Sequence, residues 1–193
     1  GLCLIGQTAE LAPADRKIYA LRDVTATVES IPLICGSILS KKLAEGIDVL
    51  VLDVKFGRGA FMKDKARARE LAQTLVSVAT TFGKPTRALL TAMDEPLGRA
   101  VGNALEVAES MDCLRGNGPA DTMEVTYALG EQMLLLANVA ATKDEARARL
   151  EAAIASGAAL VKFREMVTAQ GGDVRVGVAL GDVQPRARHL PLA

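Results

Sequence analysis

The sequence lacks tryptophan, and its aromatic residues are limited to two tyrosines and four phenylalanines, 3% of 193 residues. Half of the residues are nevertheless apolar, so the interior must be built from Ala, Leu, Val and Ile. Such side chains are typical of a parallel sheet that helices cover on both faces. A chain of this length can form a core of useful size.

Histidine and cysteine are also scarce. The one histidine, His189, and the three cysteines, Cys3, Cys35 and Cys113, lie far apart in the sequence. The cysteines lack the C-x-x-C spacing of zinc and redox sites. Each cysteine lies among apolar residues, which predicts reduced thiols in the core and a cytoplasmic protein.

Neither sign of charge dominates, because 23 basic residues balance 23 acidic ones. A neutral chain has no overall field that attracts nucleic acid, so no nucleic-acid partner is expected. No apolar run approaches the roughly 20 residues that span a bilayer, so no membrane partner is expected either.

Apolar periodicity and helix caps predict the elements. Three apolar runs, GLCLIG, IDVLVLDV and TRALLTA, have the length of buried strands. Pro13 and Asp15 suit the first turn of a helix, whereas Asp64, Asn103 and Thr142 suit caps. The predicted strands cover 1–6, 47–54 and 86–92, and the predicted helices cover 14–22, 29–45, a segment from Asp64 to Gly83, 105–114, 122–138, 143–155 and 158–170.

The order strand, helix, strand between residues 47 and 92 predicts a βαβ unit with a parallel sheet. The fold class is therefore α/β, with a helical segment before the parallel sheet and several helices at the C-terminal side. The stretch 173–193 has no clear periodicity and is predicted to be an irregular tail.

Arg22, Ser37 and Lys41 form a polar group within an otherwise apolar stretch, residues 19–42. Ser37 and Lys41 are four residues apart, so on a helix they share a face, with Cβ atoms about 5–6 Å apart. Two cations and a hydroxyl that converge can bind a planar, acidic ring rich in oxygen. On the pattern alone, the simpler interpretation is a solvated basic helix end at Lys41 and Lys42.

The loop at residues 55–61, KFGRGAF, follows a predicted strand, at the end where open α/β sheets bind ligands. A G-x-G pair after a strand is a weak sign of phosphate binding. The third glycine and the acidic partner of a dinucleotide fingerprint are absent.

The sequence closely resembles the signature region of the thymidine and pyrimidine-nucleoside phosphorylases. The resemblance is carried by GQT at 6–8, PADRKIYALRDVTATVESIPLI, SILSKKLAEG, LDVKFGRGAFM and GNALEV, and it continues more loosely to about Gly172. It implies a transferase that performs reversible phosphorolysis. In that reaction phosphate and a pyrimidine nucleoside, whether thymidine, uridine or both, give the free base and a (deoxy)ribose 1-phosphate.

The resemblance also implies the residues that hold the base. Arg22 and Lys41 would donate hydrogen bonds to the two carbonyl oxygens of the base, which makes both of them catalytic residues. Ser37 would contact the imide edge of the base. Tyr19 would support the site, and Phe61 would lie against the base.

The family pattern in the loop is K-x-G-x-G-A-F, usually with a small residue where this chain has Arg58, so the detailed contacts of this loop stay open. In the pyrimidine-nucleoside branch, carbonyls at the positions of Leu97 and Ala100 and the carboxylate of Glu109 help bind a potassium ion. Oxygen ligands of this kind suit a hard cation. No organic cofactor is implied.

The resemblance implies a homodimer with a pyrimidine nucleoside and phosphate as its small-molecule partners. It divides the chain into a first strand at 1–12, returning helices of an α-domain at 13–45, an α/β nucleoside-binding domain at 46–172 and the tail.

The family's phosphate-binding KHSTGG-type motif is not in this chain and belongs upstream of Gly1. We therefore expect a fragment that carries the base half of the site, is inactive alone, and exposes the stripe of Ile31, Ile34 and Ile38. Two alternatives are a non-catalytic remnant and an enzyme of the anthranilate phosphoribosyltransferase type, which would not need the Arg22, Ser37 and Lys41 set.

Overall fold

The computed structural model describes residues 1–6 and 10–173, which form two compact units. The sheet unit comprises the described residues of 4–95 together with 125–150. The helical unit comprises 1–3, 96–124 and the described residues from 151 onward. The predicted tail, apart from its first residue, and His189 lie outside the described residues, as do Gln7 and Thr8 of the GQT motif.

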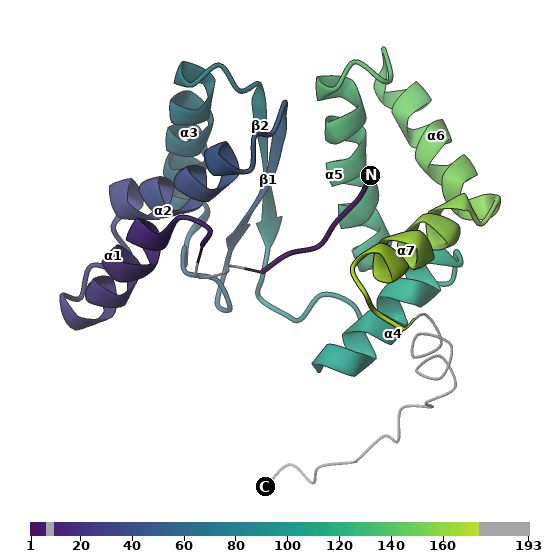
Figure 1. The fold of residues 1–193 in the computed structure, drawn as a ribbon, viewed down its shortest axis with the longest axis horizontal. Helices are drawn as coiled ribbons and strands as arrows, with labels where there is room; N and C mark the ends of the chain where they lie inside the picture. Colours follow the sequence, from purple (N-terminus) through teal and green to yellow (C-terminus); the bar gives the residue numbers. More distant parts are fainter. Residues whose placement is uncertain (7–9, 174–193) are drawn as a thin grey trace, which may run out of the picture. The chain divides into compact units, whose positions relative to one another are not determined.

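The sheet unit is built on two parallel strands, β1 (Leu50–Phe56) and β2 (Thr86–Ala92), paired in register from Leu50↔Thr86 to Phe56↔Ala92. The helix α3 (Lys65–Thr81) connects them and packs on both strands (Figure 1). Asp64 caps α3, because its Oδ1 accepts the backbone N–H of Arg67 at 2.8 Å. The predicted βαβ unit and cap are confirmed.

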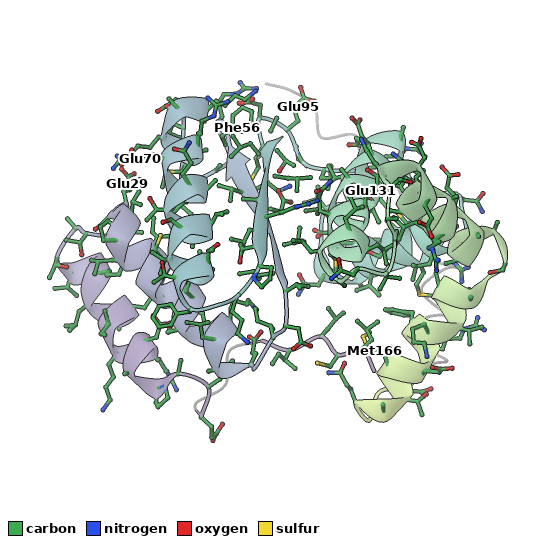
Figure 2. The ribbon with its side chains drawn as sticks, turned by 90° about the horizontal axis from the view of Figure 1, so that it is seen from above. Glu29, Phe56, Glu70, Glu95, Glu131 and Met166 are labelled. Atoms are coloured by element: carbon green, nitrogen blue, oxygen red, sulfur yellow. The ribbon has the colours of Figure 1, made fainter. Side chains whose placement is uncertain are left out.

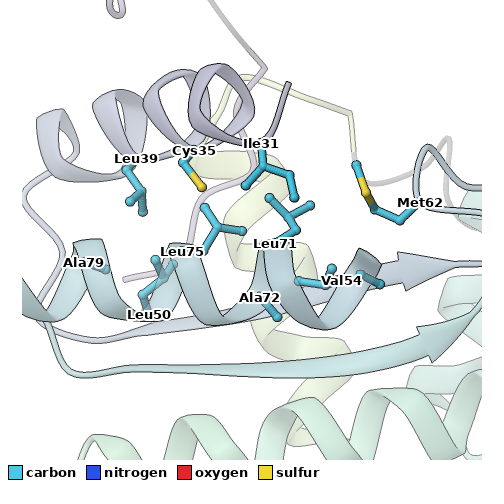
Figure 3. Packing of buried hydrophobic residues seen from close by; sticks show 11 residues of the cluster. Ile31, Cys35, Leu39, Leu50, Val54, Met62, Leu71, Ala72, Leu75 and Ala79 are labelled. Carbon is cyan, nitrogen blue, oxygen red and sulfur yellow. The ribbon is translucent and has the colours of Figure 1, made fainter. Parts of the chain in front are cut away.

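The core of the sheet unit lies between α3 and α2 (Ile31–Ala44), and α1 (Pro13–Val24) packs against α2. Ile31, Cys35 and Leu39 point from α2 toward Leu71 and Leu75 of α3 (Figure 3). The prediction that the stripe of Ile31, Ile34 and Ile38 is exposed is therefore wrong. Ile31 is buried, and the other two pack partly buried against the same cluster because α3 supplies the apolar surface that they need.

The prediction of a strand at residues 1–6 is also wrong. Residues 1–6 have no regular structure, and their apolar side chains Leu2, Leu4 and Ile5 are 52%, 67% and 60% exposed. A strand exists only where a neighbour satisfies its backbone N–H and C=O groups, and in the described part of the chain the sheet consists of β1 and β2. Cys3 lies in this segment and is exposed, so the prediction of a core thiol is wrong for it. Cys35 and Cys113 are buried free thiols, as predicted.

Up to residue 173, four helices follow the sheet: α4 (Asn103–Leu114), α5 (Ala120–Leu136), α6 (Lys143–Ala155) and α7 (Ala158–Ala169). Their positions agree with the prediction to within two residues at each end, and with the parallel sheet they confirm the α/β class. Asn103 is not the cap, because α4 begins there and Gly102 precedes it without a side-chain acceptor. Glu106 instead accepts the Gly102 N–H at 2.9 Å. Thr142 does cap α6, accepting the Glu145 N–H at 3.2 Å.

A buried ion pair joins α5 to α6. Glu131 on α5 is 1% exposed (Figure 2), and its carboxylate lies 2.7 Å from Arg147 and 3.5 Å from Lys143. The guanidinium of Arg147 also stacks 4.3 Å from the ring centre of Tyr127. Two cations around one carboxylate offset much of the cost of its burial. Within the described ranges, no helix is both long and apolar enough to cross a membrane.

Candidate active site

One pocket in the sheet unit, with a volume of about 470 Å³, gathers the five residues predicted to hold the base. Such a volume is in the usual range for small-molecule sites. The pocket is lined from α1 by Tyr19 and Arg22, from α2 by Ser37 and Lys41, and from the loop after β1 by Phe61. Tyr19 and Phe61 are 43% and 65% exposed, so aromatic surface is free at the pocket's edge.

Arg22 is buried, with 3% of its surface exposed. The turn after α1 brings the Val28 carbonyl back to the guanidinium, and Nη2 of Arg22 donates to it. The guanidinium also lies 5.0 Å from the centre of the Tyr19 ring. Its Nε is buried without a hydrogen-bond partner, alone among the buried side-chain nitrogen and oxygen atoms of the described residues. An unpaired buried donor is costly, so Nε is a donor of this site that still has capacity for an acceptor.

Lys41 lies one helical turn beyond Ser37, and its Nζ donates to the Ser37 hydroxyl at 3.0 Å, as the spacing on α2 predicts. The same Nζ forms an ion pair with Oδ2 of Asp15 at 2.7 Å. Asp15 is in the first turn of α1 and is 8% exposed. Its sequence position indicated only a favourable interaction with the helix dipole, so this fourth polar member of the site was missed.

The charge state of Asp15 follows from its neighbours. Burial by itself raises the pKa of the carboxyl group, because it disfavours the charged form. Hydrogen bonds from Lys41 and Ser37 and the charges of Lys41 and Arg22 outweigh that effect, so the pKa lies below the ordinary value of 3.8. Asp15 is therefore an anion at neutral pH, set between two cations.

We expect a carbon-13 NMR titration of the 193-residue chain to show the Asp15 carboxyl with a midpoint below 3.8. Because the pKa is lowered in the folded state, the carboxylate adds stability in full above pH 3.8, and that contribution is lost as the pH falls through the lowered midpoint. Lys41→Met should raise the midpoint, since burial remains while the main cation is gone. Lys42→Met, one residue along, should leave it unchanged. A midpoint that Lys41→Met does not move would contradict the observed ion pair.

In the loop after β1, the backbone N–H groups of residues 57–60 all have hydrogen-bond acceptors. The N–H groups of Gly57, Arg58, Gly59 and Ala60 donate to the Met62 carbonyl, the Asp94 carboxylate, the Met93 carbonyl and the Gly57 carbonyl. No N–H of these four residues is left to cradle a phosphate, so the weak G-x-G signal has a structural origin.

Backbone conformation and packing require these glycines. Gly57 has φ of +118°, and a Cβ at Gly59 would lie 2.8 Å from the Met93 carbonyl oxygen. Arg58 is accommodated because its side chain is 81% exposed, with Nε 3.7 Å from the Asp94 carboxylate.

Comparison with known proteins identifies the family. Residues 1–160 match the family described as "Glycosyl transferase family, a/b domain". The chain belongs to this glycosyl transferase family. It is also 54% identical over 175 residues to proteins named pyrimidine-nucleoside phosphorylase from Staphylococcus aureus strains bovine RF122 / ET3-1, USA300 and NCTC 8325. Each match covers 91% of this chain and 40% of the relative, so the chain spans about two fifths of the relatives' length. The predicted resemblance is confirmed.

The potassium ligands that the resemblance implies for this glycosyl transferase domain lie in the helical unit. The Glu109 carboxylate on α4 accepts the N–H groups of Arg99 at 3.0 Å and Ala100 at 3.3 Å. The N–H of Gly98 donates to Asp121 at 2.9 Å. Leu97 is in the same loop and is 44% exposed.

The Glu109 and Asp121 carboxylates both accept N–H groups from residues 98–100. Carboxylate and carbonyl oxygens are the type of ligand that a hard cation takes. A carboxylate has about four lone-pair positions, so the N–H bonds to Glu109 do not use its full capacity to accept.

Proposed function

We propose that the full-length enzyme, meaning a protein of the relatives' length that contains this segment, performs the reversible phosphorolysis of pyrimidine nucleosides. This segment would bind the base. A phosphate oxygen attacks the anomeric carbon, the bond from that carbon to the base nitrogen breaks, and its electron pair leaves with the base.

The demand on the protein follows from the leaving group. The departing base is an anion whose charge spreads over its two carbonyl oxygens. Donors aimed at those oxygens interact most strongly when the charge has developed, so they stabilise the transition state more than the substrate. A buried guanidinium and a fixed ammonium, with a serine hydroxyl between them in the chain, meet that demand.

The observation that carries the proposal is the state of Arg22. Arg22 is 3% exposed, lines the pocket and has an Nε without a partner, which suits an anionic or carbonyl acceptor. The simpler interpretation, a solvated basic helix end at Lys41 and Lys42, does not account for a buried arginine on α1. The names of the relatives support a pyrimidine nucleoside and phosphate as the substrates.

Homodimerisation is part of the same proposal. Ile18, Leu21 and Val24 on α1 are 51%, 62% and 84% exposed, which is unusual for apolar residues on one short helix. Large exposed apolar patches mark interaction surfaces, and a second copy of the protein would cover this one.

The assay that tests the function incubates the full-length enzyme with uridine or thymidine and millimolar phosphate, and follows the free base by chromatography. Release of base that depends on phosphate supports the proposal. Activity with anthranilate and phosphoribosyl diphosphate, in place of phosphorolysis, would favour the phosphoribosyltransferase alternative. Inactivity in both assays would favour a non-catalytic remnant.

We further propose that Leu97 and Ala100, through their carbonyls, and Glu109 hold a potassium ion. Because a ligand that binds only the folded state stabilises it by mass action, potassium at 100 times its dissociation constant should add about 2.7 kcal/mol and raise the melting temperature. Sodium at equal ionic strength is the matched control. Glu109→Gln should abolish the difference between the two salts, and equal melting temperatures in both salts would exclude a selective site.

A further inference from the structure

Polar burial in the described part of the chain is concentrated at the candidate active site. Five polar or charged residues are buried in the described ranges, and three of them, Asp15, Arg22 and Ser37, belong to this site. Arg22 and Ser37 line the pocket itself, whereas Asp15 lies behind Lys41 and is not among the lining residues. Asp15 therefore acts on the pocket only through its neighbours.

Lys41 has two hydrogen-bond acceptors at the site. Its ammonium donates to the Asp15 carboxylate at 2.7 Å and to the Ser37 hydroxyl at 3.0 Å. Ser37 also helps to lower the pKa of Asp15, which places the three residues in one polar group. A lysine ammonium has three donors, so two are fixed by protein acceptors and one remains for a ligand.

This arrangement orders a side chain that would otherwise be mobile. Lysine has a flexible stem of four carbons, and it loses much rotamer freedom when its end group is fixed. The Lys41 side chain is 22% exposed, so part of it is accessible to solvent. The ion pair, which joins residues 26 apart in the sequence, holds the ammonium at the pocket before any ligand arrives.

A purely structural role explains this pair less well. Ion pairs taken out of water often add little net stability, because desolvation offsets the attraction. The same carboxylate next to Arg22 and Lys41, however, reduces the repulsion between two cations that the base site needs together. The position and the charge of Asp15 therefore both indicate a role in the base site.

We propose that Asp15 is a positioning residue for the reaction, which holds Lys41 so that its free N–H points to a carbonyl oxygen of the departing base. This inference rests on the proposed function. It predicts that Asp15→Asn in the full-length enzyme lowers kcat/KM for uridine about tenfold, because asparagine has the same shape but no charge to fix the ammonium.

The test is a double-mutant cycle with Lys41→Met, which separates direct from indirect effects. If Asp15 acts through Lys41, then Asp15→Asn should cost about tenfold in the wild-type background and nothing in the Lys41→Met background. Glu45→Gln, which removes the exposed Glu45–Lys42 pair at the C-terminal end of α2, is the matched control and should change the activity in neither background.

Each outcome has one meaning. An Asp15→Asn loss that persists in full beside Lys41→Met would show a structural role and overturn the positioning inference. Normal activity of Asp15→Asn would overturn it as well. A Lys41→Met variant with normal activity would instead overturn the proposed function. If Asp15→Asn alone lowers the melting temperature too far for assay, Lys41→Met is compared with the double variant. A double variant less active than Lys41→Met would overturn the inference, and equal activity supports it.

Discussion

Replacing Arg22 or Lys41 with alanine is expected to lower kcat/KM for uridine or thymidine by at least about 100-fold in the full-length enzyme. Loss of one preorganised donor to a developing oxyanion costs about 2.7–4 kcal/mol in well-studied enzymes. The donors act mainly in the transition state, so kcat should fall together with kcat/KM.

The structure supplies matched controls for this experiment. Lys42, next to Lys41, pairs with Glu45 at 3.0 Å at the surface, and Arg16 on α1 is exposed. Lys42→Ala and Arg16→Ala remove the same charges outside the pocket and should keep normal activity. If Arg22→Ala and Lys41→Ala behave like these controls, the base-binding assignment is wrong.

Stability must be followed in the same variants, because Arg22 is more deeply buried than the sequence indicated. Alanine at this position leaves the Val28 carbonyl without its donor and removes the contact with the Tyr19 ring. Arg22→Lys retains the charge and much of the volume but lacks the planar, multi-donor group. A large loss of kcat/KM in Arg22→Lys at an unchanged melting temperature would assign the effect to recognition of the base.

Local signals predicted most of the fold. Strand β2 was predicted with its observed limits, and Pro13, Asp64 and Thr142 mark helix starts as expected, because caps and periodicity depend on neighbours within a few residues. The run at 1–6 has the same apolar composition as a strand but has no strand beside it among the described residues. The local sequence shows the apolar periodicity of a segment, but it does not show which other segment will pair with it.

The same distinction holds for the site. The Ser37–Lys41 contact follows from helical spacing alone. The five residues that the family resemblance assigns to the base all line the pocket. The sequence position of Asp15 indicates only a helix-dipole interaction, because its partner Lys41 is 26 residues away on α2. Glu131 likewise resembles a solvated residue in the sequence, and only the pairing of α5 with α6 shows why it is buried beside Arg147.

The 193-residue chain by itself is expected to show no phosphorolysis and at most weak binding of a pyrimidine base. Holding two reactants in line supplies about 7–11 kcal/mol of the lowering of the barrier in well-oriented systems. The proposed base site has a pocket in the described residues. The loop most similar to a phosphate cradle, however, already uses the N–H groups of residues 57–60 in hydrogen bonds within the protein. The prediction therefore assumes that the phosphate is held by residues outside this chain.

The measurement compares two readouts on the same preparation. Incubation of the chain with uridine and millimolar phosphate should release no uracil above a no-protein blank. Titration with uracil, followed by NMR shifts at Ser37 and Phe61, should show weak binding that Lys41→Met abolishes and Lys42→Met does not. Turnover near that of a full-length phosphorylase would mean that a phosphate site exists within these residues. It would also separate the two halves of the proposal, because the base site would stand while its incompleteness would not.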